Sequence, residues 1–253
     1  MDTDRLLAWY DQVRRPLPWR TTRDPYALLV SEVMLQQTQA QRVIPYYENW
    51  LARFPTAHAL AEATPRDVLH AWSGLGYNRR ALALQAAARQ ITTSGWPDDL
   101  TELPGVGPYT AAAVASFAWD RDAAAIDTNV RRVLERREGP RPPAALRARV
   151  DELLPRGRAA AFNQAMMELG ATVCRPRAPR CGECPVAAGC GGHVVAPRRR
   201  AGVPFEQTDR FARGRFIAAL VAGEPPPRVA ERVLAGLARD GLIVRGADGV
   251  RLP

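Results

Sequence analysis

All the cysteines of this chain stand within one short segment. Cys174, Cys181, Cys184 and Cys190 fall within 17 residues, and the 253-residue sequence has no other cysteine. In a reducing compartment such clustering favours metal ligation over disulfide bonds. Four thiolates suit structural zinc or an iron–sulfur cluster. Zinc sites usually show two close cysteine pairs, and only Cys181 and Cys184 are close here, so the spacing favours a 4Fe–4S cluster.

Composition and the start of the chain indicate a globular, cytoplasmic protein. Apolar residues make up 47% of the chain and charged residues 24%, which excludes wholesale disorder. The longest uncharged apolar run, residues 106–119, is too short to span a bilayer. The acidic, polar residues 1–4 do not resemble a secretory signal.

The basic residues are of one kind and lie mostly in the second half. All 35 are arginine, and the net charge is +9. Residues 1–127 hold 12 arginines and 14 acids, whereas residues 128–253 hold 23 arginines and 12 acids. A preference for arginine codons would explain the missing lysine but not this asymmetry, which favours a nucleic-acid partner. Without lysine, Schiff-base chemistry on a lysine side chain is excluded.

The hydrophobic pattern predicts an all-α fold. Apolar residues recur at three- and four-residue spacing, and alanine and leucine dominate. Residues 194–209 are expected to form a linker, followed by a small winged-helix-like module with a hairpin at residues 242–252. The helices are expected at residues 3–14, 26–38, 41–52, 65–72, 79–93, 109–119, 129–138, 143–153, 158–171, 210–222 and 228–239.

A glycine-containing loop precedes one of these helices. Residues 103–110 read Leu-Pro-Gly-Val-Gly-Pro-Tyr-Thr. Two glycines permit a tight turn that exposes N–H groups, and the helix start adds partial positive charge, so the loop suits a phosphate. This pattern is typical of a helix–hairpin–helix that binds the DNA backbone. A plain helix–turn–helix corner is the alternative.

Two acids stand out for their surroundings. Glu32 lies in a neutral, half-apolar helix, where a carboxylic acid can keep its proton near neutral pH and serve as a general acid. A solvent-facing glutamate is the alternative. Asp127 stands at the start of a helix and is expected, as an isolated feature, to be an N-cap.

In their order along the chain, these features resemble the helix–hairpin–helix DNA glycosylases of the endonuclease III superfamily. Within this superfamily, the features resemble in particular the adenine DNA glycosylases of the MutY type, over roughly residues 5–193. It rests on Ser-Glu-Val-Met-Leu-Gln-Gln-Thr at 31–38, the loop at 103–110, Asp-Thr-Asn at 127–129, the four cysteines, Leu-Pro-Trp-Arg at 17–20, Gly-Leu-Gly-Tyr at 74–77 and Phe-Asn-Gln-Ala-Met-Met-Glu-Leu-Gly at 162–170.

The resemblance implies a domain plan. Residues 22–127 would form a six-helix domain with the helix–hairpin–helix, and residues 1–21 with 128–193 an iron–sulfur cluster domain. Residues 194–209 would be the linker and residues 210–253 the small C-terminal module, similar to the short tails of some actinobacterial members. A full Nudix-type domain, which senses 8-oxoguanine in many members, is not expected. The protein would be a bacterial, nucleoid-associated monomer.

The resemblance also implies a reaction, base excision repair by hydrolysis of the N-glycosidic bond of adenine opposite 8-oxoguanine or guanine. Glu32 would protonate N7 of adenine, and Asp127 would stabilise the oxocarbenium-like sugar once the nucleotide has left the stack. Trp19, Arg20, Leu35 and Glu168 would form the adenine pocket. Gln37 and Tyr77 would enter the vacated duplex. The further DNA-binding residues would be Thr38, Gly105, Val106, Gly107, Arg175, Arg177 and Arg180.

One position separates this chain from its lyase relatives. Tyr109 stands where endonuclease III enzymes place the lysine that forms a Schiff base, so a monofunctional glycosylase is expected. Thr128 and Asn78 replace the glycine and tyrosine of many adenine DNA glycosylases. Thymine or uracil mismatch glycosylases, which also carry a tyrosine in the hairpin, are therefore the alternative. A non-catalytic DNA-binding iron–sulfur protein is less expected, because both carboxylates are present.

Overall fold

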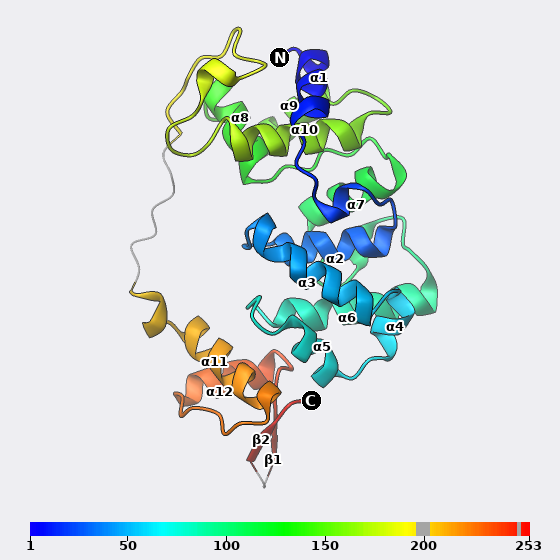
Figure 1. Ribbon diagram of the computed structural model, residues 1–253, viewed down its shortest axis with the longest axis vertical. Coiled ribbons are helices and arrows are strands. Elements are labelled where there is room, and N and C mark those ends of the chain that lie inside the picture. Colours follow the sequence, from blue (N-terminus) through cyan, green and yellow to red (C-terminus); the bar gives the residue numbers. More distant parts are fainter. Residues whose placement is uncertain (196–202, 247–248) are drawn as a thin grey trace. The chain divides into compact units, whose positions relative to one another are not determined.

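A computed structural model describes residues 1–195, 203–246 and 249–253. These residues form twelve α-helices, short 3-10 turns and one two-stranded sheet, which confirms the all-α prediction with its C-terminal hairpin (Figure 1). The chain divides into two compact units. The first unit comprises Met1–Leu28 and Gly107–Arg199, and the second comprises Leu29–Val106 and Arg200–Pro253. None of the described helices combines the length and apolarity that crossing a membrane requires.

The first unit is built around α10 (Ala159–Thr172), which packs against α1 (Thr3–Val13), α7 (Pro108–Trp119) and α8 (Thr128–Glu138). Its apolar residues recur at helical spacing, and Phe162, Ala165, Met166 and Leu169 are all fully buried. The helix α9 (Pro143–Leu153) adds Leu146 and Val150, one turn apart, to the same core. The 3-10 turns Pro18–Arg20 and Cys181–Glu183 complete this unit.

One glycine allows two helices of the first unit to touch. A Cβ placed on Gly170 of α10 would lie 2.5 Å from the Cβ of Asn129 at the start of α8. That distance is far below van der Waals contact, so a larger residue at position 170 would push α8 away. The glycine thus fixes where α8 begins, and Asp127 with it.

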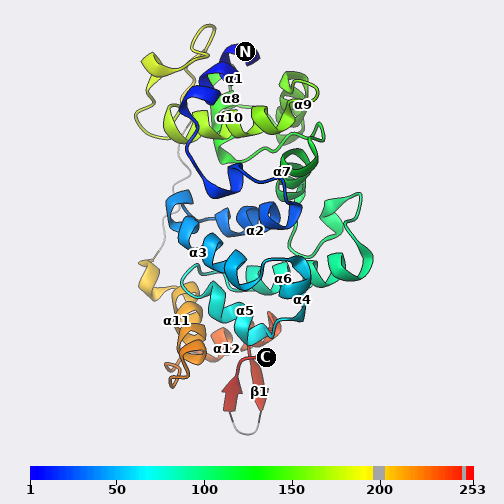
Figure 2. The same cartoon turned by 45° about the vertical axis from the view of Figure 1, so that its right-hand side comes forward.

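The second unit begins within α2 (Pro25–Leu35), a helix that both units share, and continues through α3 (Ala40–Arg53), α4 (Ala57–Glu62), α5 (Pro65–Trp72) and α6 (Arg79–Ser94). Figure 2 shows α3, α5 and α6 beside one another. Trp50 and Trp72 are fully buried and meet edge to face with ring centroids 5.4 Å apart. Gln85 of α6 donates to the carbonyls of Leu60 and Ala63, so the end of α4 is tied to α6.

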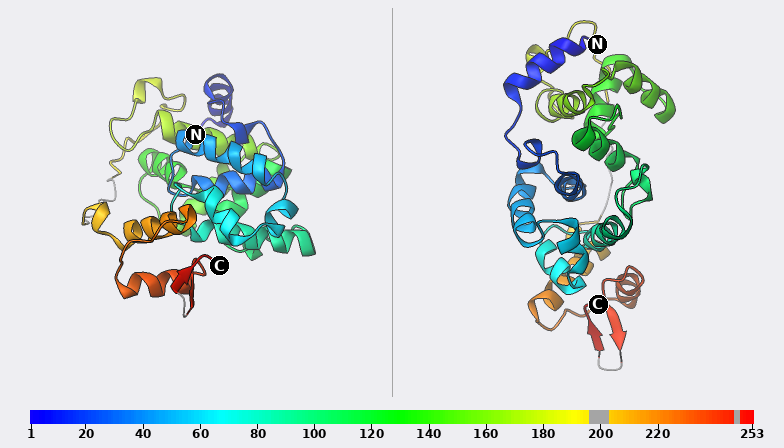
Figure 3. Two further views of the ribbon diagram at one scale, coloured as in Figure 1. Left: turned by 60° about the horizontal axis from the view of Figure 1, so that its bottom comes forward. Right: turned by 90° about the vertical axis from the view of Figure 1, so that its right-hand side faces the viewer.

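The C-terminal module belongs to the second unit. It consists of a 3-10 turn at Phe205–Gln207, α11 (Asp209–Ala222), α12 (Glu231–Arg239), β1 (Val244–Gly246) and β2 (Gly249–Arg251), drawn in orange to red in Figure 3. The strands pair antiparallel, with Val244 opposite Arg251. Leu69 of α5 is buried in the same apolar cluster as Phe216, Ile217 and Leu237 of the module. The module is therefore docked on α5 by a shared core.

Several observed elements differ from the prediction, and the last helix, expected from residue 228, begins only at Glu231. The helix expected at 26–38 ends at Leu35, because Gln37 adopts a positive φ of 61° that no α-helix continues through. The short α4 was not predicted, since six residues carry little periodicity; its Thr56 N-cap, which accepts from the amide of Ala59, was the available signal. The expected linker at 194–209 already contains a 3-10 turn and the start of α11, while residues 196–202 lie outside the described part.

Candidate active site

Glu32 lies inside an apolar helix. In α2 every residue from Tyr26 to Met34 is buried, and Glu32 itself is only 4% exposed. The alternative of a solvent-facing glutamate is therefore wrong. A carboxyl group so placed has lost most of its contact with water, which is the environment expected of a general acid.

Asp127 is the N-cap of α8, as expected from its position. One carboxylate oxygen accepts from the backbone amides of Asn129 and Val130 at 2.8 and 2.7 Å, and the other accepts from the Asn129 side chain at 2.6 Å. Burial raises the pKa of Asp127, although these hydrogen bonds oppose the shift. Arg132 in turn donates to the side-chain oxygen of Asn129 at 2.7 Å. Asp127 belongs to the first unit and Glu32 to the second.

In the first unit two arginines meet at the buried carboxylate of Glu168, a predicted adenine-pocket residue. Glu168 is fully buried, accepts from Arg20 at 2.6 Å, and accepts from Arg15 at 2.6 and 3.0 Å. Burial acts to raise its pKa, but the two arginines outweigh it and the pKa is lowered. Trp19 is 6% exposed on the turn that carries Arg20. Leu35, the fourth predicted pocket residue, is half-buried at the end of α2 in the second unit.

The predicted DNA-contacting loops of the second unit line one groove of about 1410 Å³. Gln37 and Tyr77 both have left-handed backbones, with φ of 61° and 50°, and the Tyr77 side chain is 39% exposed. This conformation is uncommon for non-glycine residues, and those that adopt it cluster at active sites and ligand-binding loops. The groove also includes Thr38 and Gly105, so the structure brings four of the predicted DNA-binding residues to one surface.

The glycine loop at residues 103–110 has the expected left-handed glycine at Gly105, but the amide of Val106 is not exposed for a phosphate. Gly105 has a φ of +78°, and a Cβ there would lie 2.8 Å from the Cβ of Ala83. Val106 is 7% exposed, and its amide donates to the carbonyl of Leu103 at 3.1 Å, so that N–H group is engaged within the loop. Gly107 is the N-cap of α7. The hydroxyl of Tyr109 contacts the sulfur of Met167 at 3.9 Å.

Arg80 is a positioning residue that the sequence analysis missed. It donates to the carbonyls of Val33 and Gln36 at 2.7 and 2.6 Å, and to the carbonyl of Gly76 at 3.2 Å. One guanidinium therefore joins the end of α2 to the loop that carries Tyr77. Burial lowers the pKa of Arg80 to about 10. Its place in the first turn of α6 gave no sign of these buried contacts, because arginine is common in exposed helical turns.

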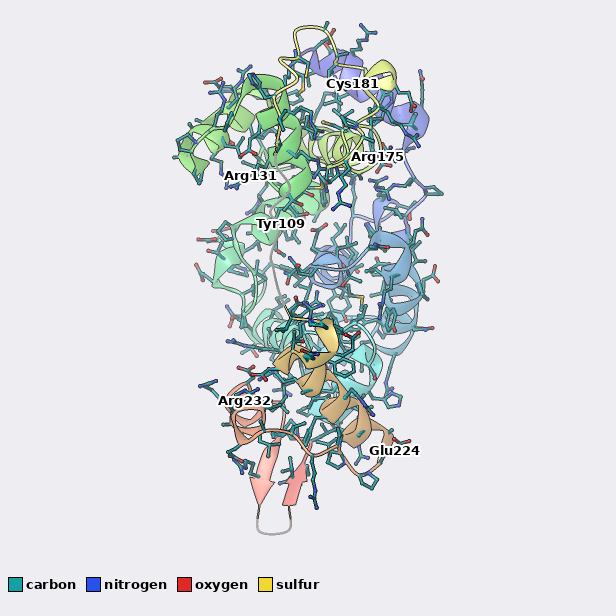
Figure 4. The ribbon with its side chains drawn as sticks, turned by 90° about the vertical axis from the view of Figure 1, so that its left-hand side faces the viewer. Tyr109, Arg131, Arg175, Cys181, Glu224 and Arg232 are labelled. Atoms are coloured by element: carbon teal, nitrogen blue, oxygen red, sulfur yellow. The ribbon has the colours of Figure 1, made fainter. Side chains whose placement is uncertain are left out.

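The four cysteines follow α10 in the first unit, and Figure 4 shows Cys181 on the same stretch as Arg175. Burial raises the pKa of the Cys184 thiol, and the other three cysteines raise it further. Arg136 donates to the sulfur of Cys174 at 3.1 Å, which suits a thiolate. The donor chemistry fits a four-thiolate centre, although among the described residues no group of three or more ligand side chains is arranged around a metal position.

The arginines between the cysteines present a basic surface. Arg177 and Arg180 are exposed, and Arg180 pairs with Glu183 at 3.5 Å. Arg175 is half-buried and donates to the carbonyl of Ala178 at 3.0 Å. Exposed arginines can reach phosphates without further rearrangement of the loop.

Comparison with known proteins first identifies the broad class of proteins that this chain resembles. Residues 30–156 match the family described as "HhH-GPD superfamily base excision DNA repair protein". The structure is similar to that of a thermostable thymine-DNA glycosylase, with a TM-score of 0.70 and 30% identity over 75% of this chain and 93% of that chain. A trapped endonuclease III–DNA covalent intermediate shares the fold, with a TM-score of 0.66 and 23% identity over 75% of this chain and 92% of that chain.

The sequence relatives narrow the class. The chain is 43% identical to "Adenine DNA glycosylase" of Mycobacterium tuberculosis over 96% of this chain and 90% of the relative. It is 42% identical to that of Mycolicibacterium smegmatis, over 96% and 93%. The human protein of the same name is 44% identical over 73% of this chain and 38% of its own length. The chain belongs to the adenine DNA glycosylase family of HhH-GPD base excision DNA repair proteins.

Proposed function

We propose that this protein removes adenine from duplex DNA where it lies opposite 8-oxoguanine or guanine. The observation that carries the reaction type is the buried carboxyl of Glu32 on an otherwise apolar helix. The choice of adenine is supported by the relatives of that name. The basic second half of the chain and the groove with Gln37 and Tyr77 suit a DNA partner.

In this proposal Glu32 donates its proton to N7 of the extruded adenine, which weakens the bond from C1′ to N9. When that bond breaks, its electron pair leaves with adenine and the sugar becomes cationic. The carboxylate of Asp127 stabilises this cation. Water then attacks C1′ and gives a proton to Glu32, which restores the acid. The products are free adenine and a DNA strand with an intact backbone at the abasic site.

We further propose that the enzyme lacks lysine-dependent lyase activity. The sequence has no lysine, and Tyr109 stands where the resemblance places the lysine nucleophile of endonuclease III enzymes. Reduction with borohydride during turnover is expected to trap no covalent enzyme–DNA adduct once the N-terminal amine is blocked. A strong adduct under those conditions would contradict the proposal.

The four cysteines are proposed to hold a 4Fe–4S cluster, which would fix the basic loop containing Arg177 and Arg180. Their grouping within 17 residues and the hydrogen bond from Arg136 to the sulfur of Cys174 support this assignment. Iron and acid-labile sulfide are expected in equal amounts in the purified protein, with broad visible absorbance. Zinc without sulfide would contradict this assignment.

A second candidate is excision of thymine or uracil from mismatches with guanine. Two observations support this second candidate. They are the similarity to the thymine-DNA glycosylase at 30% identity and the presence of Thr128 in place of glycine. Single-turnover assays on duplexes with A:8-oxoG, A:G, T:G and U:G pairs separate the candidates. Release of adenine from the first two alone is expected. Release only from T:G or U:G would overturn the adenine assignment, and binding without any release would indicate a non-catalytic protein.

A further inference from the structure

The C-terminal module forms part of the groove that contains Tyr77. Its contribution to the lining includes Phe205, Arg210, Phe211, Arg213 and Arg215. Among the described residues that line the groove, six arginines face a single acid, Asp240, which already pairs with Arg213. The groove is therefore strongly basic on the side of the module as well as on the side of the Tyr77 loop.

Arg210 makes the direct contact between the module and the Tyr77 loop. Its guanidinium carbon lies 4.4 Å from the centroid of the Tyr77 ring and 5.0 Å from that of Phe205. It also donates a hydrogen bond to the Tyr77 hydroxyl. The planar cation thus covers an exposed aromatic ring in a basic groove, where a nucleic-acid base could also stack.

The position of Arg210 is fixed by the fold of the module. It lies in the first turn of α11, where Thr208 caps the helix by accepting from the amide of Phe211 at 3.2 Å. Further along α11, Phe216 and Ile217 are buried against Leu69 of α5. A guanidinium held this way loses less conformational freedom on meeting a ligand than one on a mobile tail.

We propose that Arg210 reads the purine opposite the excised adenine, by donating to hydrogen-bond acceptors on the edge that carries O6 and position 7 while it stacks beside Tyr77. The proposal rests on the function proposed above, in which Tyr77 enters the duplex and leaves that purine without a pairing partner. An arginine fork matches the adjacent acceptors of guanine, which are O6 and N7. In 8-oxoguanine N7 carries a proton, but the O6 and O8 carbonyls both accept. A pyrimidine or an abasic position offers no matching pair of purine acceptors.

The test compares binding across opposite bases. Equilibrium Kd values are measured on duplexes whose target adenosine carries a 2′-fluoro group that resists hydrolysis, opposite 8-oxoguanine, guanine, cytosine or an abasic analogue. Arg210→Ala is expected to weaken binding about tenfold opposite 8-oxoguanine and guanine, in keeping with the loss of one arginine–base contact. Opposite the abasic analogue, Arg210→Ala is expected to weaken binding only by the amount that loss of one positive charge elsewhere in the module causes.

Arg232→Ala supplies that charge control, because Arg232 lies in the same module (Figure 4). Its side chain is 72% exposed and pairs with Asp209, and neither residue lines the groove. Arg210→Lys keeps the charge but not the fork, so it is expected to lose the preference for purines while retaining affinity for the abasic duplex. Equal weakening by Arg210→Ala opposite all four positions, or none, would overturn the proposal. Absence of adenine release by the unmodified protein from normal substrates would instead overturn the proposed function, and this proposal with it.

Discussion

At the scale of single residues, two charged side chains join structural and functional roles. Asp127 caps α8 and is also the proposed stabiliser of the sugar cation. Arg80 holds the end of α2 and the Tyr77 loop together through three carbonyls. Both side chains already make hydrogen bonds within the free protein. Substitutions must therefore be chosen so that an effect on folding stability can be told apart from an effect on activity.

Asp127→Asn makes that separation for the carboxylate. Asparagine caps helices as well as aspartate does, whereas Asp127→Ala is expected to cost about 1 kcal/mol of unfolding free energy through loss of the cap. Because burial raises the pKa of Asp127 above its ordinary value of 3.8, ionisation disfavours the native state as pH rises through that value. At pH 7 loss of the buried charge favours the asparagine variant, but its amide nitrogen replaces the oxygen that accepts from the Asn129 side chain, so its stability is expected to stay within about 1 kcal/mol of the wild type while adenine excision is lost.

Urea unfolding at pH 7 and single-turnover kinetics of both variants test this prediction. Normal excision by a folded Asp127→Asn protein would remove the carboxylate from the mechanism.

Arg80→Met keeps most of the side-chain volume but removes the donor to the carbonyl of Val33 and the shorter of two hydrogen bonds to that of Gln36, whereas the carbonyl of Gly76 keeps the Trp72 indole as a donor. A buried acceptor so stranded costs about 1–3 kcal/mol, so a clear loss of stability is expected. The neighbouring Arg79 is 76% exposed and lies 3.8 Å from Asp240, so Arg79→Met is expected to change stability by less than about 1 kcal/mol. Chemical denaturation of both variants gives the comparison, and equal losses would contradict the positioning role of Arg80.

At the scale of elements, helices were predictable and the turns that carry function were not. The strong periodicity of α10 and the glycine and proline punctuation around α7 located those helices to within about two residues. The left-handed backbones at Gln37 and Tyr77 had no such signal, because neither residue type favours positive φ. Long-range contacts such as those of Arg80 hold these conformations, and local sequence does not encode them.

Two glycines of the loop at 103–110 give a matched test of how that element is built. Gly105→Ala would combine a positive φ with a Cβ only 2.8 Å from Ala83, and is expected to lower the unfolding free energy by about 2 kcal/mol or more. Gly107 has an ordinary φ of −90°, and a Cβ there meets none of the described atoms within 4 Å. Gly107→Ala is therefore expected to be nearly neutral for thermal stability. A larger loss for Gly107→Ala than for Gly105→Ala would contradict this account of the turn.

At the scale of the whole molecule, the order of motifs along the chain carried the prediction of family, and the comparisons confirm it. The four cysteines and Glu32 were recognisable because their residue types are rare in such surroundings, whereas Asp127 alone indicated only an N-cap and received its proposed role from the family resemblance. The contribution of the C-terminal module to the groove could not be predicted, because the contact between Arg210 and Tyr77 joins residues 133 positions apart. Such contacts depend on how the module docks on α5.

The asymmetric charge of the chain predicts steeply salt-dependent DNA binding. Replacing Arg175, Arg177 and Arg180 together by alanine is expected to reduce the slope of log K against log salt by about 1–3 units, since each lost phosphate contact removes about 0.9. Alanine at the exposed Arg5, Arg14 and Arg66, in the acid-rich first half, is the charge-matched control. Equal slopes for the two triple variants would show that net charge, and not the basic loop, determines the salt dependence.

Adenine release by the Glu32→Gln variant tests the central claim most directly. The measurement is the single-turnover rate at saturating protein on a duplex with one A:8-oxoG pair, beside the exposed control Glu62→Gln. Loss of a general acid alone lowers a rate by about 10² to 10⁴, so Glu32→Gln is expected to fall at least that far while its Kd for an uncleavable duplex stays that of the wild type. The control is expected to release adenine at the wild-type rate. Wild-type release by a folded Glu32→Gln protein would contradict the account.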